Sequence, residues 1–84
     1  MKFYYITFRS VTAAQRGEKV LHKAGVRATL LRTPKWMEVQ GCGYSLRLWT
    51  DDVQPAIQLL QDQGILFRRV YIQSVDGTLE ELEL

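Results

Sequence analysis

The stretch FYYITFRSVTAAQRGEKVLHKAGVRATLLR, residues 3–32, begins with one strand pattern and ends with another. Residues 3–9 are rich in aromatic and β-branched side chains that alternate between two faces, which predicts a strand. One of these faces holds Tyr4, Ile6 and Phe8. Residues 26–32 alternate well enough to predict a second strand.

The middle of the same stretch has the spacing and the end signals of a helix. Small or apolar residues recur at helical spacing at Ala13, Gly17, Val20, Leu21 and Ala24. Thr12 followed three residues later by Gln15 forms a capping-box pattern, and Gly25 is a helix-stop signal. The whole stretch therefore predicts a β-α-β unit.

The remaining chain predicts a second set of elements after a loop at residues 33–43. Residues 44–49 alternate as a strand, a helical pattern then ends at Gly64, and residues 65–73 predict a fourth strand. For residues 78–84, TLEELEL, we expect a short helical turn or a mobile end.

The order β-α-β-β-α-β predicts an α+β, ferredoxin-like fold. We expect a four-stranded antiparallel sheet with two helices on one face, and with strand 44–49 between strands 3–9 and 26–32. Residues 1–75 are expected to form a single domain, and residues 76–84 an acidic C-terminal tail.

Composition and charge narrow the class of protein. The chain has 84 residues, enough for one modest core, and 46% of them are hydrophobic. A single cysteine excludes an internal disulfide, the N-terminus is not that of a signal peptide, and no apolar run approaches the ~20 residues that span a bilayer. We therefore expect a cytoplasmic protein that does not bind membranes.

The charge is unevenly distributed along the chain. The net charge is +2, but the last nine residues hold four of the nine acidic residues, so residues 1–75 carry eleven bases against five acids, or +6. A basic body favours an anionic ligand, a nucleic acid or an acidic partner, although an ordinary soluble surface remains an alternative.

The only cysteine, Cys42, lies between two glycines. In the expected topology the start of the third strand lies beside the end of the first, next to the N-terminus of the first helix. Cations and helix amides at that place lower the pKa of a thiol from its usual ~8.5. We therefore predict a nucleophilic Cys42, with a partly buried, inert thiol as the alternative. The residues expected to expose or stabilise its thiolate are Gly41, Gly43, Lys35, Arg9, Ser10 and Thr12.

No cofactor or metal site is expected. One cysteine and one histidine cannot supply the usual ligand set of a metal, and no glycine-rich phosphate loop of a standard pattern occurs. His22 is expected on the surface at the far end of the first helix, away from Cys42.

The sequence also resembles the putative selenium/sulfur carrier family, small domains with a Cys-Gly motif, over roughly residues 3–73. The matching residues are Thr7, Phe8, Ser10, Gly25, Pro34, Cys42, Gly43, Leu46 and Arg47. Two features depart from the family pattern. Lys35 replaces the usual arginine, which keeps the charge but loses a bidentate donor, and WMEVQG (36–41) is bulkier than the usual serine-rich run.

The resemblance implies a carrier rather than a turnover enzyme. Its cysteine thiolate would accept a sulfur or selenium atom from a donor protein, hold it as a persulfide or selenide, and pass it to an acceptor protein. No second cysteine is needed for this chemistry.

Two other functions stay open. One is a non-catalytic regulatory or protein-interaction module of the same fold, which commonly dimerises through sheet edges. The other, less favoured, is RNA binding. The segment CGYSLRLW (42–49) overlays an RNA-recognition pattern at Gly43, Tyr44 and Trp49, but it lacks the leading base and the central aromatic residue, so we do not expect a nucleic-acid partner.

Overall fold

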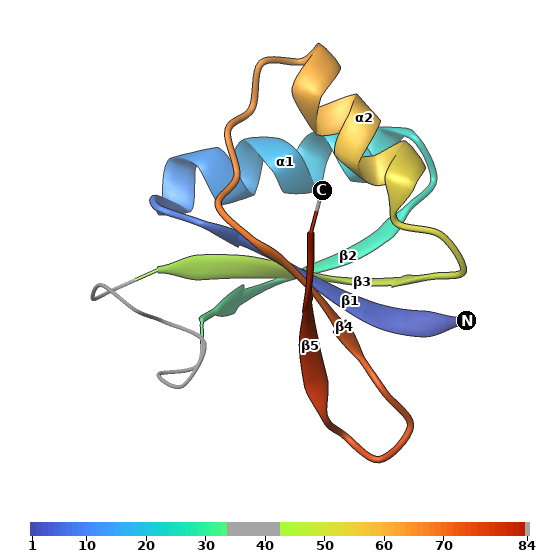
Figure 1. Ribbon diagram of the computed structural model, residues 1–84. Helices are drawn as coiled ribbons and strands as arrows, with labels where there is room; N and C mark the ends of the chain where they lie inside the picture. The colour runs from blue at the N-terminus through green and yellow to red at the C-terminus, as the bar shows by residue number, and fades with distance from the viewer. Residues whose placement is uncertain (34–42, 84) are drawn as a thin grey trace.

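The computed structural model describes residues 1–33 and 43–83, which form an antiparallel sheet with two helices on one of its faces (Figure 1). In chain order the elements are β1 (Lys2–Phe8), α1 (Val11–Lys23), β2 (Arg27–Arg32), β3 (Tyr44–Thr50), α2 (Gln54–Asp62), β4 (Val70–Gln73) and β5 (Leu79–Leu82). The two helices were predicted from the hydrophobic periodicity, and the α+β class and the common face of the helices from the order of the elements.

The core lies between the helices and one face of the sheet. Alternate residues of the strands point into it, because successive side chains of a strand lie on opposite faces. The strands contribute Tyr4, Ile6, Phe8, Ala28, Leu46, Leu48 and Val70, and the helices contribute Ala14, Leu21, Ala56, Ile57 and Leu60. The polar faces of both helices remain toward solvent.

The strand order is β2-β3-β1-β4-β5, with β1 in the centre and every pair antiparallel. β3 lies between β1 and β2, the neighbours that were expected for residues 44–49. Phe8 at the end of β1 pairs with Tyr44 at the start of β3, and Ile6 pairs with Val70 at the start of β4. The starts of β3 and β4 therefore both lie at the end of β1.

Both helices end in the way their glycines predict. Gly25 has a φ of 80° and Gly64 a φ of 69°, the left-handed region that favours glycine. The next residue then folds back onto the helix: the Val26 N–H donates to the Leu21 carbonyl and the Ile65 N–H to the Leu60 carbonyl, each at 2.9 Å. These are Schellman motifs, and they return the chain toward the sheet.

The N-cap of α1 is Ser10, so the prediction of a capping box at Thr12 was wrong. The Ser10 hydroxyl accepts a hydrogen bond from the Ala13 N–H at 3.2 Å, whereas Thr12 is exposed inside the first turn. Either hydroxyl could serve chemically. β1 ends at Phe8, and the extended backbone of Ser10 (φ −129°, ψ 153°) lets the helix begin two residues earlier than predicted.

The fourth strand is shorter than the predicted span 65–73, because its first part is irregular. The Thr7 N–H donates to the Arg69 carbonyl at 2.9 Å, while the Arg68 N–H donates to the Thr7 carbonyl at 2.7 Å. Arg68 and Arg69 therefore together oppose one residue of β1, which is a β-bulge. Regular pairing begins only at Val70.

In the described part of the chain the sheet has five strands rather than the predicted four. Residues 79–82, expected as a helical turn or a mobile end, form β5 and pair with β4 from Val70↔Leu82 to Gln73↔Leu79. Gly77, with a φ of 89°, makes the turn between the two strands. Pairing decides the conformation here, because the edge of β4 offers hydrogen-bond partners that the isolated segment lacks.

In the parts of the chain that the structure describes, neither helix has the length and apolar character required to cross a membrane.

Candidate functional site

The sequence placed its candidate site where β1 ends and β3 begins. We call this end of the sheet the rim. It comprises the ends of β1 and β2, the starts of β3 and β4, and the adjoining residues Thr33, Gly43, Arg9, Ser10, Arg68 and Arg69. These residues share one end of the sheet because β3 and β4 both run antiparallel to β1 and start where β1 ends. Cys42, Gly41 and Lys35 lie outside the described residues.

Hydrogen bonds join the two described positions that flank residues 34–42. The Thr33 N–H donates to the Gly43 carbonyl at 3.0 Å, and the Thr33 hydroxyl donates to the Ser45 hydroxyl at 3.3 Å. Thr33, Gly43 and Ser45 are all buried. Because buried backbone and hydroxyl groups need partners, these bonds hold the start of β3 firmly against the end of β2. The position that follows Cys42 in the chain is thus fixed within the sheet.

The N-terminus of α1 begins at the rim. Arg9 and Ser10 follow directly after β1; Arg9 is exposed, and Ser10 is exposed while its hydroxyl caps the helix. The first turn of α1 contains no acidic residue. The partial positive charge of the helix end is therefore not offset within its own first turn. Thr12 lies on the exposed side of that turn and, unlike Ser10, caps no helix amide.

The start of β4 brings two more arginines to the same place. Ile6 pairs with Val70 at the start of β4, and Arg68 and Arg69, which precede it, lie opposite Thr7 near the end of β1. The Thr7 hydroxyl accepts a hydrogen bond from the Arg69 N–H at 3.1 Å. The Arg69 guanidinium lies 3.5 Å from the carboxylate of Glu81 on β5, an ion pair that is about half exposed.

The rim arginines Arg9, Arg68 and Arg69 all border one cavity. It has a volume of about 570 Å³ and is lined by Arg9, Ser10, Ala13, Leu66, Phe67, Arg68 and Arg69. Leu66, one of the lining residues, is 85% exposed. Leu66 and Phe67 were not predicted at this site, because they fall in a run of sequence that resembles a strand. The paired Arg68 and Arg69, which blur the register of that run, were the signal that it is irregular.

Chemically, this end of the molecule suits an anion or an acidic partner. Arginine side chains, a helix N-terminus and an apolar contact surface lie together there, and one of the arginines, Arg69, is paired with Glu81 of β5. His22 is exposed at the C-terminal end of α1, as predicted, with its Nε2 2.8 Å from the Ala28 carbonyl oxygen. Among the described residues, no group of His, Cys, Asp and Glu side chains is arranged to hold a metal ion.

The comparison with known families agrees with the resemblance noted above. The chain matches the family described as "Putative Se/S carrier protein-like" over residues 3–72, from the start of β1 into β4. No curated protein and no solved structure gives a significant match. Since the matched range covers most of the 84 residues, the chain belongs to the Se/S carrier protein-like family.

Proposed function

We propose that this protein carries a sulfur or selenium atom on the thiolate of Cys42. The observation that carries the proposal is the family match over residues 3–72. The rim supports it, because Gly43, the residue after Cys42, directly precedes Tyr44, which pairs with Phe8 at the end of β1, and the cap of α1 follows at Ser10. In this proposal Lys35 and Arg9 offset the negative charge, while Gly41 and Gly43 give access and amide donors. Ser10 helps by holding the helix end in place.

The proposed transfer is an exchange without net oxidation. The Cys42 thiolate attacks the terminal sulfur of a donor persulfide and displaces the donor thiolate, so that one S–S bond breaks as another forms. The product is a persulfide on Cys42, whose terminal sulfur an acceptor nucleophile then attacks. Selenium is transferred in the same way when the donor cysteine holds it as an S–SeH group: the Cys42 thiolate attacks the selenium and displaces the donor thiolate. A reducing compartment keeps such a thiol available, and we place the protein in the cytoplasm.

The donor and the acceptor are proposed to be proteins that dock at the rim. An exposed Leu66 beside Phe67 offers an apolar contact, and Arg9, Arg68 and Arg69 around it favour an acidic partner surface. The strand order β2-β3-β1-β4 supports a ferredoxin-like assignment in which β5 is an added edge strand.

The first test is the reactivity of the thiol. The rate of alkylation of Cys42 by iodoacetamide, followed by intact mass from about pH 5 to about pH 10, gives the pKa of the thiol. We expect a pKa below the ~8.5 of a free thiol, and a higher pKa in the variants Arg9→Gln and Arg68→Gln. Arg16→Gln, an exposed position in the middle of α1, is the matched control and should leave the pKa unchanged.

The second test is loading and transfer. Incubation with a low-molecular-weight persulfide should add the mass of one sulfur atom to the protein, and Cys42→Ser should abolish the addition. An acceptor thiol should then recover that sulfur. A thiol with an ordinary or raised pKa that takes up no sulfur would contradict the carrier function. The non-catalytic interaction module would then be the better-supported function. Partner binding, or a concentration-dependent homodimer, that persists in Cys42→Ser would identify it.

A further inference from the structure

The face of the sheet opposite the helices carries an unusual set of side chains. Cross-strand pairing arranges them in two rows, which together we call the open face. The first row, from β2 to β5, is Arg27, Trp49, Phe3, Gln73 and Leu79, and the second is Thr29, Arg47, Tyr5, Tyr71 and Glu81. In a two-layer fold, the face of the sheet that points to solvent normally carries polar residues. Here four aromatic residues occupy its centre.

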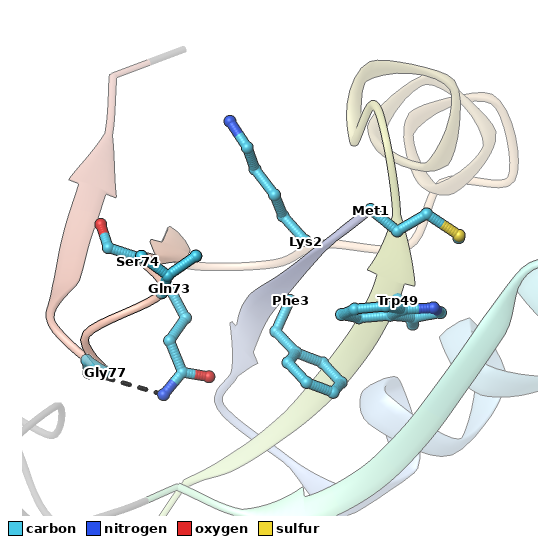
Figure 2. A pocket seen from close by; sticks show the side chains of 8 residues that line it. Met1, Lys2, Phe3, Trp49, Gln73, Ser74 and Gly77 are labelled. Atoms are coloured by element: carbon cyan, nitrogen blue, oxygen red, sulfur yellow. Dashed lines mark hydrogen bonds between the residues drawn. The ribbon is translucent and has the colours of Figure 1, made fainter.

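The aromatic and basic side chains of the open face contact one another. The rings of Phe3 and Trp49 lie 4.5 Å apart between centroids at an interplanar angle of 49°, and Figure 2 shows them next to each other. The guanidinium carbon of Arg47 lies 4.9 Å from the centroid of Phe3. Trp49 remains 36% exposed. Ring and guanidinium planes that are held in place and still reach solvent are surfaces on which further planar groups can stack.

A hollow lies on each side of the Phe3–Trp49 pair. One, of about 260 Å³, is lined by Phe3, Trp49, Arg27, Thr29 and Arg47. The other, of about 410 Å³, is lined by Phe3 and Trp49 again, together with Met1, Lys2, Gln73, Ser74, Val75 and Gly77 (Figure 2). Both therefore combine a shared aromatic wall with hydrogen-bonding or cationic groups.

The charge of the open face has one sign over most of its width. Strands β1, β2 and β3 contain no acidic residue, while Arg27 and Arg47 project from β2 and β3. The acidic residue of the two rows is Glu81, on the edge strand β5, and it is paired with Arg69. A ligand that crosses from β2 to β4 thus meets aromatic rings with cations beside them and no opposing carboxylate.

We propose that the open face binds single-stranded nucleic acid, with bases stacked on Trp49, Phe3 and Arg47 and with phosphates near Arg27 and Arg47. Unpaired bases and a phosphate backbone are the ligand chemistry that stacking planes flanked by arginines recognise. A duplex hides its base faces and is disfavoured.

Trp49 is the one residue that the open face shares with the pattern that first raised RNA binding. In the sequence, Tyr44 and Trp49 were overlaid on one recognition pattern, but an odd spacing places them on opposite faces of β3, and Tyr44 packs against the core. The cross-strand neighbours of Trp49 are instead Phe3 on β1 and Arg27 on β2, from positions remote in the sequence.

The test is fluorescence anisotropy of the full chain with a labelled single-stranded RNA of about ten nucleotides, and with DNA of the same sequence. We expect saturable binding that weakens with rising salt. Trp49→Leu should reduce the affinity at least about fivefold, because it keeps an apolar side chain but removes the stacking plane. Leu66→Ala, an exposed apolar side chain at the rim, is the matched control and should leave the affinity unchanged.

A second pair of variants tests the charge. The double variant Arg27→Ala/Arg47→Ala should weaken binding and flatten its salt dependence. Arg16→Ala on α1 is the control and should change the affinity and its salt dependence much less. Binding should persist in Cys42→Ser, which separates this proposal from the carrier function. Circular dichroism confirms that each variant is folded. Absence of saturable binding to both probes, tighter binding of the duplex form, or equal loss in the control variants would overturn the proposal.

Discussion

Ser10 shows how one hydroxyl determines where α1 begins. Its side chain satisfies the Ala13 N–H, one of the amides that the first turn of a helix leaves without a partner. Thr12, two residues later, is exposed and makes no such bond in the described structure. The two positions therefore differ in role although their side chains are chemically alike.

We predict that Ser10→Ala lowers the free energy of unfolding by about 1 kcal/mol, because the capping bond is lost. The change is measured by urea denaturation followed by circular dichroism. Thr12→Ala is the matched control and should change the stability by less than about 0.5 kcal/mol. The opposite ranking would show that the helix begins at Thr12.

Gly17 is a buried residue of α1 that lies close to both the sheet and α2. A Cβ at this position would lie 3.2 Å from side-chain atoms of Leu46 and of Leu60, and 3.3 Å from Phe8. All three of these side chains are fully buried, so none has free space into which to move.

Gly17→Val is accordingly expected to destabilise the protein by about 1–3 kcal/mol, because the added methyl groups overpack the core. Thermal and urea unfolding measure the loss. Gln15→Val, on the exposed face of the same helix, controls for the helix propensity of valine and should cost much less. Equal losses at both positions would mean that packing at Gly17 is not tight.

The β4–β5 hairpin is closed by a turn that depends on one carboxylate. The Ser74 N–H donates to the Thr78 carbonyl at 2.8 Å, and the Thr78 N–H donates to the Asp76 carboxylate at 3.0 Å. The hydrogen bonds from the backbone and then the side chain of Thr78 lower the pKa of Asp76 below its ordinary value of 3.8. Since the depressed pKa belongs to the folded state, the stabilisation is complete above the ordinary pKa and is lost as the pH falls through the lowered one.

The carboxyl resonance of Asp76, followed by NMR titration, should therefore have a midpoint below 3.8. Thr78→Val removes the hydroxyl donor and keeps the backbone N–H, so the midpoint should rise only part of the way. In Asp76→Asn the pH dependence of unfolding in this range should weaken. A midpoint that Thr78→Val leaves unmoved would show that the hydroxyl makes no contribution.

Across the whole molecule, β5 is an addition to the sheet. The family match ends at residue 72, within β4, and among the described residues β5 pairs with β4 alone. It does contribute Leu82, which packs against the core, and Glu81, which pairs with Arg69. We propose that residues 1–75 contain what the fold requires.

A chain ending after Val75 should thus keep its far-UV circular dichroism while losing about 1–2 kcal/mol of stability, since part of Leu82 burial is lost. Its net charge rises from +2 to +6, because four of the nine acidic residues are removed and all eleven bases remain. If the acidic segment also shields the rim, truncation should change the affinity for a partner that docks there. An unfolded truncated chain would show that residues 76–84 belong to the domain.

Local signals in the sequence were sufficient for most elements. The glycines after both helices predicted their ends, because a left-handed backbone is a property of the residue itself. The alternating apolar residues of β1 and β3 predicted which side chains face the core. The expected antiparallel pairing of these strands predicted that the start of β3 would lie beside the end of β1, where Phe8 pairs with Tyr44. Leu79 and Leu82, three residues apart among glutamates, were compatible with a helical turn as well as with a strand, so local preference could not decide between them.

The outline of this protein thus follows from its order of residues: two helices against an antiparallel sheet, and a family match. These features depend on periodicity and on neighbours within a few positions. The edge of β4 decided that residues 79–82 become a strand, the bulge at Arg68 and Arg69 set the arginines at the rim, and the sheet brought Phe3, Tyr5, Trp49 and Tyr71 onto one face. Each of these required contact between segments far apart in the chain, and such contacts are chosen by the free energy of the whole fold rather than by local preference.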